Sequence, residues 1–403
     1  MRGVVIDENK CIVKKIQYHW EITEAREYVV WQKYLSRLLM EIPLEFRLNI
    51  HAIAINGTSS TVLTCDAYGQ PVQAPMMYND ACPVEILSEL RKNVPFNHIV
   101  FNTTSSLAKL IWMSKLSYFS NAKYFLHQAD WLGFILHRKL GITDYHNALK
   151  LGYDVENFQY PNWLEDYSIH INLPQVVAPG TSIAELCSEI SMKYHFPASC
   201  IVCAGTTDSI AAFIASGAKF PGEAVTSLGS TLVLKLISTN KIEDSKYGIY
   251  SHRLGNLWLA GGASNTGGAV LKHFFSSGEL ENLSAQIDPS KLSNLDYYPL
   301  LAPGERFPIN DPHLSPRMKP RPNNTAKFLH GMLEGIARIE NRGYYLLKQL
   351  GADNLSLVYT TGGGSVNDTW RQIRKNFLRV PVIIPHNIEA AYGTALLAMK
   401  SIK

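Results

Sequence analysis

Two short stretches of small and hydroxyl-bearing residues constrain this chain more than any other feature. The first, Cys203–Ser209, ends an apolar run with a carboxylate, and the second, Val225–Thr231, follows a short small-residue helix. Each pattern is typical of a β-strand that stops at a turn where backbone N–H groups and hydroxyls converge on an anion. The first turn's carboxylate could accept a proton from a substrate hydroxyl while the second turn holds phosphates. Together they predict an ATP-dependent kinase for a small polyol or sugar.

The composition narrows the class of protein. A chain of 403 residues with 46% hydrophobic and 18% charged residues is expected to form about two globular domains. A net charge of +4 is too small for a nucleic-acid binder, and apolar runs such as Thr231–Ile237 are much shorter than the roughly 20 residues of a membrane span. We therefore expect no nucleic-acid or membrane partner. Six scattered cysteines and the lack of a signal peptide before Arg2 predict a cytoplasmic location.

Cys200 and Cys203 form a CxxC pattern, which can be half of a zinc site or a redox pair. No second pair and no paired histidines follow at ligand spacing. In an extended segment, residues three apart face opposite sides of the sheet, so the geometry favours a buried strand.

Apolar spacing predicts alternating strands and helices along the chain. In the first half, the expected strands are Arg2–Asp7, Cys11–Tyr18, His51–Asn56, Thr61–Asp66 and Ser199–Thr206, and the expected helices are Glu24–Ile42, Ser106–Lys115, Asp130–Leu140 and Ser209–Gly217. The pattern restarts at Glu223, with strands within Val225–Ile237, Asn256–Gly261, Leu355–Thr360 and Pro381–Ile384, and helices Gly268–Phe275, Ala326–Leu350, Asn367–Leu378 and Glu389–Ser401. The restart indicates an α/β chain of two modules.

Several polar and glycine-rich segments carry a family resemblance. In chain order they are Ile55–Val62, Tyr78–Asp80, Gln128–Trp131, Asp144–Tyr153, Gly205–Ala212, Ser227–Thr231, Gly261–Gly268, Gly304–Arg306 and Gly362–Ser365. Their order resembles the FGGY family of carbohydrate kinases, and within it looks most like the D-ribulose kinases of cyanobacteria and plants, over essentially the whole chain. The resemblance implies two ribonuclease-H-like domains of the actin, hexokinase and heat-shock ATPase type around a central cleft. It places the sugar on residues 1–216 and ATP mainly on residues 217–403.

By this resemblance, Asp208 is the catalytic base and also contacts the substrate, because it accepts the proton of the terminal sugar hydroxyl. From the residues alone, Asp208 can equally cap the helix that follows it, since Asp is a favoured N-cap residue. Gly229, Ser230 and Thr231 match the residues that meet the β- and γ-phosphates of ATP. A Gly-Ser turn is also typical of an ordinary hairpin.

Gly363, Gly364 and Asn367 resemble the family's adenosine motif. Glycines lack Cβ atoms and so allow a flat base or ribose to lie against the backbone, while Asn367 can bond an adenine edge or cap a helix. Gly267 and Gly268 resemble the opposite wall of the same pocket. Strand-to-helix turns use glycines too, so the glycines alone do not decide the matter.

Thr58, Ser59, Ser60 and Asp80 match the substrate loop of the family. Hydroxyls and a carboxylate suit a polyol, because a site that hydrogen-bonds each hydroxyl rejects analogues that lack one.

Other polar residues are expected to have no direct role in the reaction. Asp and Asn commonly close turns, which favours a structural role for the polar group Asp144, His146, Asn147 and Lys150. The charges of Arg338 and Glu340 on the long helix are expected to be solvated.

The beginning of the chain departs from the family pattern. The family starts with a strand and an Asp-x-Gly-Thr-Ser-type hairpin that grips the phosphates and helps to hold Mg²⁺, whereas Met1–Asp7 resembles the strand after that hairpin. A missing central strand with about five buried apolar side chains, at roughly 1.5–3 kcal/mol each, would cost on the order of 10 kcal/mol, comparable to the stability of a domain. We therefore expect the natural chain to begin upstream of Met1.

Three functions compete at this stage. The first is ATP-dependent phosphorylation of D-ribulose to D-ribulose 5-phosphate, and the second is the same reaction on D-xylulose or another ketopentose or polyol. The third is a catalytically inactive protein that binds a sugar or a nucleotide, which the missing hairpin allows. The kinase functions imply ATP and Mg²⁺ as cofactors and a small-molecule sugar as partner. The metal ligands and the oligomeric state, a homodimer included, are left open.

Overall fold

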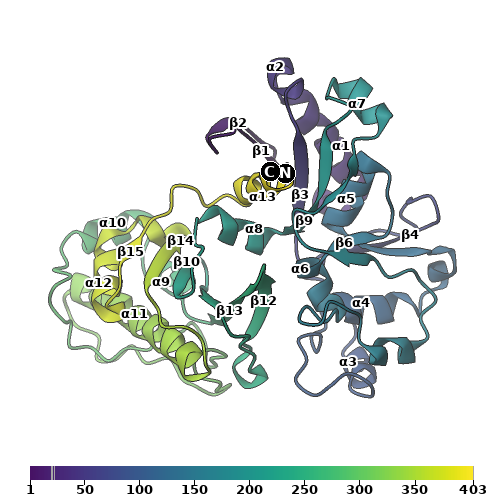
Figure 1. Ribbon diagram of the computed structural model, residues 1–403. Helices are drawn as coiled ribbons and strands as arrows, with labels where there is room; N and C mark the ends of the chain where they lie inside the picture. Colours follow the sequence, from purple (N-terminus) through teal and green to yellow (C-terminus); the bar gives the residue numbers. More distant parts are fainter. Residues whose placement is uncertain (20, 22, 403) are drawn as a thin grey trace. The chain divides into compact units, whose positions relative to one another are not determined.

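A computed structural model describes residues 1–403 except Trp20, Ile22 and Lys403, and it divides the chain into two compact units (Figure 1). The N-terminal unit contains Met1–Ala215 together with the tail that begins at Asn387, and the C-terminal unit contains Ser216–His386.

The N-terminal unit is built on a three-stranded sheet in the order β3 (Ala52–Gly57), β9 (Ile201–Thr207) and β8 (Ser182–Glu185). The predicted first two strands form a separate antiparallel pair, β1 (Arg2–Ile6) with β2 (Ile12–Gln17). Two further two-stranded sheets pair β4 (Val62–Cys65) with β5 (Tyr124–His127), and β6 (Ile142–Asp144) with β7 (Gln175–Val177).

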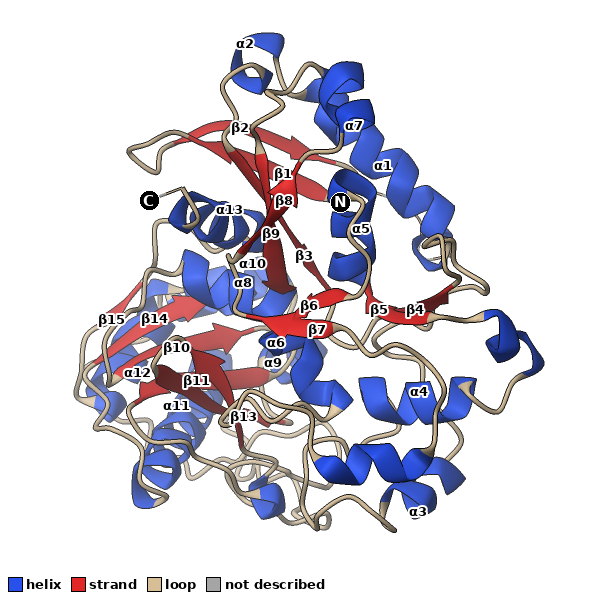
Figure 2. Ribbon diagram, turned by 45° about the vertical axis from the view of Figure 1, so that its right-hand side comes forward, coloured by secondary structure: helices blue, strands red, loops and turns tan. Residues whose placement is uncertain are grey.

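Short helices surround these strands (Figure 2). The α-helices are α1 (Tyr28–Glu41), α2 (Leu44–Arg47), α3 (Glu85–Leu90), α4 (Ser106–Met113), α5 (Gln128–His137), α6 (Tyr145–Ala148), α7 (Ser188–Tyr194), α8 (Asp208–Ala215) and α13 (Ala390–Lys400). The 3-10 helices are η1 (Glu24–Arg26), η2 (Ser117–Asn121), η3 (Leu149–Leu151) and η4 (Asn162–Tyr167). The helix predicted over Glu24–Ile42 is therefore divided into η1 and α1.

The C-terminal unit contains one six-stranded sheet. Its order is β12 (Tyr250–Leu254), β13 (Leu257–Ser264), β11 (Leu232–Ser238), β10 (Glu223–Leu228), β14 (Leu357–Thr361) and β15 (Val382–Ile383). The helices are α9 (Gly268–Phe274), α10 (Ser277–Ser284), α11 (Thr325–Gln349) and α12 (Asp368–Leu378), with η5 (Ser245–Tyr247) and η6 (Gly363–Val366). β10 and β14 run parallel and each ends at one of the predicted nucleotide loops.

Residues that favour helix ends flank the long helix α11 on both sides. The Asn324 side chain accepts a hydrogen bond from the N–H of Lys327 at 2.9 Å and so caps the first turn. Gly351, at φ +104°, follows the last turn in a conformation that L-residues rarely adopt. Every residue from Phe328 to Ala337 is buried, so this half of α11 is covered on all sides by neighbouring elements, among them β11, β13, α10 and α12.

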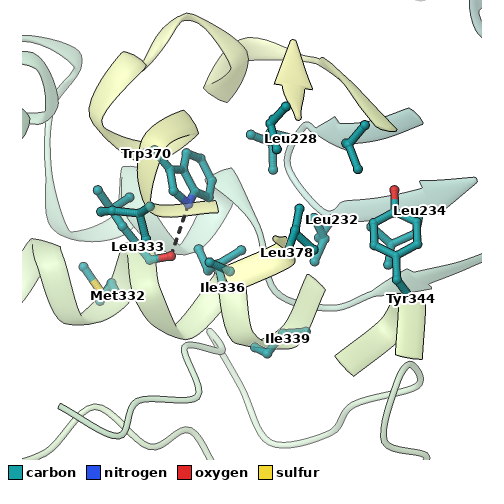
Figure 3. Close-up of a cluster of buried hydrophobic side chains, with 14 of the residues drawn as sticks. Leu228, Leu232, Leu234, Met332, Leu333, Ile336, Ile339, Tyr344, Trp370 and Leu378 are labelled. Atoms are coloured by element: carbon teal, nitrogen blue, oxygen red, sulfur yellow. Dashed lines mark hydrogen bonds between the residues drawn. The ribbon is translucent and has the colours of Figure 1, made fainter. Parts of the chain in front are cut away.

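The apolar core of the C-terminal unit joins this sheet to α11 and α12. Figure 3 shows Leu228 and Leu234 of the sheet together with Leu333 and Ile336 of α11. Trp370 of α12 lies in the same cluster, and its Nε1 donates to the Leu333 carbonyl at 3.2 Å. A buried tryptophan thus keeps its one polar group satisfied.

Two charged residues lie inside this core. Arg374 donates from Nε and Nη2 to the two carboxylate oxygens of Glu340, at 2.6 and 2.7 Å, and neither side chain is exposed. Arg374 also donates to Thr360 Oγ1 at 2.6 Å, and Thr226 Oγ1 donates to Glu340 at 2.5 Å. The expectation that Glu340 is solvated is therefore wrong. Arg338, two residues before Glu340, does keep part of its side chain exposed.

The C-terminal helix α13 belongs to the N-terminal compact unit, although it lies within residues 217–403 that were predicted as the second domain. α13 packs on α8 and β3 of the N-terminal unit. Gly393 permits this approach, because a Cβ atom there would lie 1.8 Å from the carbonyl oxygen of Ala211. Asn56 Nδ2 of β3 donates to Thr394 Oγ1 at 2.7 Å. The order of elements along the sequence does not reveal that the chain returns to its first unit.

We expect Arg374→Met to lower the free energy of unfolding by roughly 3–5 kcal/mol, because it leaves the Glu340 carboxylate buried without a counter-ion. The double variant Glu340→Leu/Arg374→Met should lose less than the single variant, since no unpaired charge remains. Urea denaturation of each variant measures the effect. Lys291→Met is the control, because it removes an exposed ion pair with Asp288 and should cost under about 1 kcal/mol. A cost for Arg374→Met as small as that of the control would contradict the assigned role of the pair.

Candidate functional site

The parallel pairing of β3 and β9 brings two predicted site segments to the same edge of a sheet. Gly57 pairs with Thr207 at the ends of these strands. The next residues along the chain, Thr58 and Asp208, therefore emerge at that edge together. Gly205 allows the two strands to approach there, because a Cβ atom at this position would lie 1.7 Å from the Ile55 carbonyl oxygen.

Asp208 is the first residue of α8 and is half-buried. Its carboxylate accepts a hydrogen bond from the N–H of Ser209 at 2.7 Å, so it lies at the positive end of the helix dipole. Lys150 of η3 is its charged neighbour: burial lowers the pKa of Lys150, and the negative charge of Asp208 opposes that shift. Lys150, assigned to a structural polar group from the sequence, is thus electrostatically linked to the predicted base.

The hydroxyl loop after β3 is held by neighbouring polar side chains. Gln128 Oε1 accepts from the N–H of Thr58 at 3.1 Å and from its hydroxyl at 3.2 Å. The hydroxyls of Thr58 and Thr61 lie 2.5 Å apart, and Thr61 Oγ1 accepts from the N–H of Tyr78 at 2.9 Å. Thr61 thereby ties the loop of the predicted sugar residues Thr58, Ser59 and Ser60 to the loop that carries Asp80.

The Asp80 carboxylate is already engaged. Arg26 donates to both of its oxygens, at 2.9 and 2.7 Å, and the N–H of Met77 donates to Oδ2 at 2.7 Å. Burial alone would raise the pKa of Asp80, but the hydrogen bonds from Arg26 and Met77 outweigh burial and leave the pKa below its usual value. Arg26 is a residue that sequence reasoning did not identify.

A buried polar cluster supports the end of β9. Asp144 Oδ1 accepts from the N–H groups of His146 and Asn147, at 2.8 and 3.2 Å, and so caps α6. His146 Nδ1 lies 2.7 Å from Thr206 Oγ1, two residues before Asp208. These three residues of the predicted polar group therefore make turn and strand contacts of the structural kind expected from the sequence.

Burial raises the pKa of Asp144 to about 7, with a further contribution from the negative charge of Asp130. Both carboxylates line a small cavity of about 20 Å³ that also borders Gly205. A volume of this size can hold a single water molecule, and such a water needs polar partners of this kind.

In the C-terminal unit, the three predicted nucleotide loops touch one another through their glycines. The Gly268 N–H donates to the Gly229 carbonyl at 2.8 Å, and a Cβ atom on Gly268 would lie 2.7 Å from that oxygen. A Cβ atom on Gly267 would lie 2.7 Å from the Ser230 carbonyl oxygen, and one on Gly362 would lie 2.7 Å from the Leu228 carbonyl carbon. Contacts this close leave no room for a side chain, so the loops are packed backbone against backbone.

The remaining predicted nucleotide residues lie around this junction. Thr231 is half-buried between Ser230 and β11, and Ser230 is exposed. A Cβ atom on Gly364 would lie 2.5 Å from the Trp370 ring, whereas nothing lies within 4 Å of one on Gly363. Gly363 therefore presents an open face of backbone.

Asn367 acts as a helix cap here. Its Oδ1 accepts from the N–H of Trp370 at 2.9 Å, and its Nδ2 donates to Ser284 Oγ at 2.8 Å. Of the two roles considered from the sequence, the capping role is the one that the structure shows. Contact with an adenine edge stays a prediction.

Glu305 makes hydrogen bonds to the loop before Gly267. It lies in the segment Gly304–Arg306, which is one of those that carry the family resemblance. Its carboxylate is almost fully buried and accepts from Ser264 Oγ at 2.6 Å and from the N–H of Asn265 at 2.7 Å. Tyr298 OH donates to it at 2.9 Å. A single carboxylate thus fixes the turn between β13 and α9.

A separate hollow of about 290 Å³ in the C-terminal unit does not coincide with these loops. It is lined by Pro289, Ser290, Lys291, Leu292, Glu334, Ile373, Asn376 and Phe377. We do not place the nucleotide there, because none of the predicted nucleotide residues reaches it.

Among the described residues, no group of three or more His, Cys, Asp and Glu side chains is arranged to hold a metal ion. None of the described helices is both long and apolar enough to cross a bilayer.

Comparison with known structures identifies the fold. The xylulose kinase from Brucella ovis superimposes with a TM-score of 0.85 at 21% identity, covering 99% of this chain and 88% of that one. The glycerol kinase of Plasmodium falciparum, solved with ADP, gives a TM-score of 0.83 at 18% identity, covering 100% of this chain and 87% of that one. The fold is therefore that of the sugar kinases with two actin-like, ribonuclease-H-like domains, as predicted.

Sequence comparison finds one family model and several related kinases. Residues 224–402 match the model of the FGGY family of carbohydrate kinases, C-terminal domain. The xylulose kinase of Staphylococcus xylosus is 21% identical over 374 residues, which are 87% of this chain and 76% of the relative. These matches support the FGGY prediction over residues 224–402.

We expect the stability of the wild-type protein to fall, relative to Asp144→Asn, as the pH rises from about 4 to about 7. The folded-state pKa of Asp144 is raised, so the folded state binds a proton in this window that the unfolded state has released. The relative loss should reach at most about 1.4 kcal/mol per pH unit. Asn at this position keeps an acceptor and cannot titrate. Urea denaturation across the window tests the expectation, and a pH-independent difference between the two proteins would show that Asp144 stays ionised.

Proposed function

We propose that this protein phosphorylates a ketopentose with ATP, and that its substrate is D-ribulose, which it converts to D-ribulose 5-phosphate. One observation carries the proposal: the ends of β3 and β9 set the carboxylate of Asp208 beside the hydroxyl loop that starts at Thr58. A base and a set of hydroxyls at one sheet edge suit the deprotonation of a sugar hydroxyl. The family of residues 224–402 and the convergence of three glycine loops support ATP as the phosphate donor.

The reaction uses the residues of this chain as follows. Asp208 accepts the proton of the terminal sugar hydroxyl, whose oxygen forms a bond to the γ-phosphorus. The bond from that phosphorus to the bridging oxygen breaks and ADP leaves. Asp208 then releases the proton to solvent. Thr58, Ser59, Ser60 and Asp80 would hold the other sugar hydroxyls.

The nucleotide loops fit this role by their backbone. Gly229, Ser230 and Thr231 follow β10 and would direct N–H groups and hydroxyls at the β- and γ-phosphates. The open face at Gly363 leaves space for a ribose or a base against the backbone, with Gly267 and Gly268 on the other side. Mg²⁺ is usually bound by one or two carboxylates together with nucleotide phosphates, so it would arrive with ATP and neutralise the phosphate charge.

D-Xylulose is the second candidate substrate. The S. xylosus and B. ovis proteins that resemble this chain are xylulose kinases, whereas the motifs of the sequence look most like those of D-ribulose kinases. The two sugars differ in the configuration at one hydroxyl-bearing carbon. Discrimination between them therefore requires hydrogen bonds directed at that one hydroxyl.

A substrate panel tests the proposal. ADP release is measured with D-ribulose, D-xylulose and glycerol at matched concentrations, and we expect kcat/KM to be at least about tenfold higher for D-ribulose. A preference for D-xylulose would transfer the proposal to the second candidate. If calorimetry detects bound sugar or ADP but no substrate turns over, the protein is an inactive binding homologue and the kinase proposal is wrong.

Asp208→Asn should reduce kcat by roughly 10²- to 10⁴-fold while sugar binding changes only a few-fold, because the amide keeps the shape of the carboxylate and cannot accept the proton. Steady-state kinetics and calorimetric sugar titration give the two quantities. Asp66→Asn is the matched control, since Asp66 caps an exposed turn through the N–H groups of Tyr68 and Gln70. Retention of more than about a tenth of the wild-type rate would remove Asp208 from the role of base.

A further inference from the structure

A buried lysine lies beneath the two loops that carry the proposed sugar residues. Lys109 is on α4, between apolar residues such as Leu107 and Ile111, and its side chain is fully buried. Its Nζ donates to the carbonyl oxygens of Ser60 and Met77, each at 2.6 Å. A lysine is almost never buried in this way unless its charge is compensated, so these two contacts need an explanation.

Both carbonyls lie in loops, and the Met77 carbonyl also accepts from the N–H of Asp80 at 2.9 Å. Ser60 adopts φ +64°, in the left-handed region that non-glycine residues seldom occupy. Met77 is held on its other side by its N–H, which donates to the Asp80 carboxylate at 2.7 Å. Lys109 therefore fixes Ser60 on one loop and, through Met77, the position of Asp80 on the other.

We propose that Lys109 is a positioning residue for the sugar, which sets the distance between the loop of Thr58, Ser59 and Ser60 and the loop of Asp80. The inference rests on the proposed function, because it assigns the sugar to these loops. Lys109 acts through the backbone of both loops and is not a catalytic residue. Its loss should weaken sugar binding and leave ATP binding unchanged, since the nucleotide loops belong to the other unit.

The charge of Lys109 gives this arrangement a pH dependence. Burial lowers the pKa of Lys109 to about 8, while Cys82 and Asp80 act to raise it and Lys150 to lower it further. The pKa of the Cys82 thiol is itself raised to about 11, so Cys82 stays neutral where Lys109 titrates. Charge-assisted hydrogen bonds are about twice as strong as neutral ones, so deprotonation of the ammonium loosens its hold on the two carbonyls.

The test compares Lys109→Met and Lys109→Arg with Lys115→Met. Lys115 lies just beyond α4, and its partly exposed ammonium pairs with Glu89 at 2.9 Å, so this control removes a lysine charge without touching the loops. We expect Lys109→Met to raise KM for the sugar at least about tenfold, with KM for ATP changed less than about twofold, as for the loss of charge-assisted hydrogen bonds. The control should change neither. Equal changes in both KM values, or a change in kcat alone, would overturn the inference.

The wild-type protein supplies a second measurement that does not depend on how well the methionine variant folds. KM for the sugar should rise as the pH passes 8 while KM for ATP does not, and Lys109→Arg should abolish this rise because a guanidinium stays charged. A rise that persists in Lys109→Arg belongs to another group, such as Lys150, and overturns the inference.

Failure of the proposed kinase function can be distinguished from failure of the inference about Lys109. If the wild-type protein turns over no sugar, hydrogen exchange at residues 58–61 and 77–80 decides whether Lys109 holds the two loops. Faster exchange in Lys109→Met than in Lys115→Met would support the positioning role, and equal exchange would exclude it.

Discussion

The buried pair of Glu340 and Arg374 is the interaction on which the geometry of the proposed nucleotide loops depends. Through Thr226 and Thr360 it reaches two strands that are partners in a parallel ladder. Each strand ends one or two residues later in a nucleotide loop, and the loops meet where Gly362 approaches the backbone of Leu228. A bidentate guanidinium has one geometry for binding a carboxylate, so the pair imposes a fixed spacing on the strands above it.

In the N-terminal unit, a different charged group fixes the spacing of the two loops that carry the proposed sugar residues. A single ammonium, Lys109, bonds two loop carbonyls there, and no carboxylate accepts directly from it in the described structure. In both units a buried charged side chain determines the geometry of nearby loops. The free-energy cost of removing its charge from water is offset by short hydrogen bonds. Exposed ion pairs such as that of Lys291 with Asp288 lack this constraint because water competes for both partners.

The features that could be predicted from the sequence are those that depend on residues close together in the chain. Apolar periodicity located ten of the fifteen strands and eight of the thirteen α-helices in the described part of the chain, and it missed the strands β5 to β8 and β12. The small-residue turns at Gly229 and Gly363 were recognised because glycine and hydroxyl residues follow apolar runs there. Residues whose role depends on distant partners were missed. Glu340 looked solvated because its partner lies 34 residues away on another helix. A signal did exist for Lys109, since it is the only charged residue in the run Ser106–Met113.

The position of α13 also depends on contacts between residues far apart in the sequence. No local pattern shows that residues after Asn387 return to the first unit, and the close contact of Gly393 with Ala211 becomes visible only when α8 is in place. The family model of residues 224–402 includes α13, so the sequence domain and the compact unit differ by one helix. That helix contacts β3 through Thr394 and Asn56, two residues before Thr58. A segment from the end of the chain thus supports the strand that leads into the sugar loop.

The pairing of Asp80 with Arg26 bears on the kind of sugar that suits the proposed function. A bidentate pair has no net charge, and it offers both N–H donors and carboxylate lone pairs at its rim. Sugar hydroxyls both donate and accept, so they match such a rim. The remaining positive charge of Lys109 is directed at backbone carbonyls and has no exposure to solvent. Under the proposed function, this rim therefore matches the hydroxyls of a polyol such as a ketopentose.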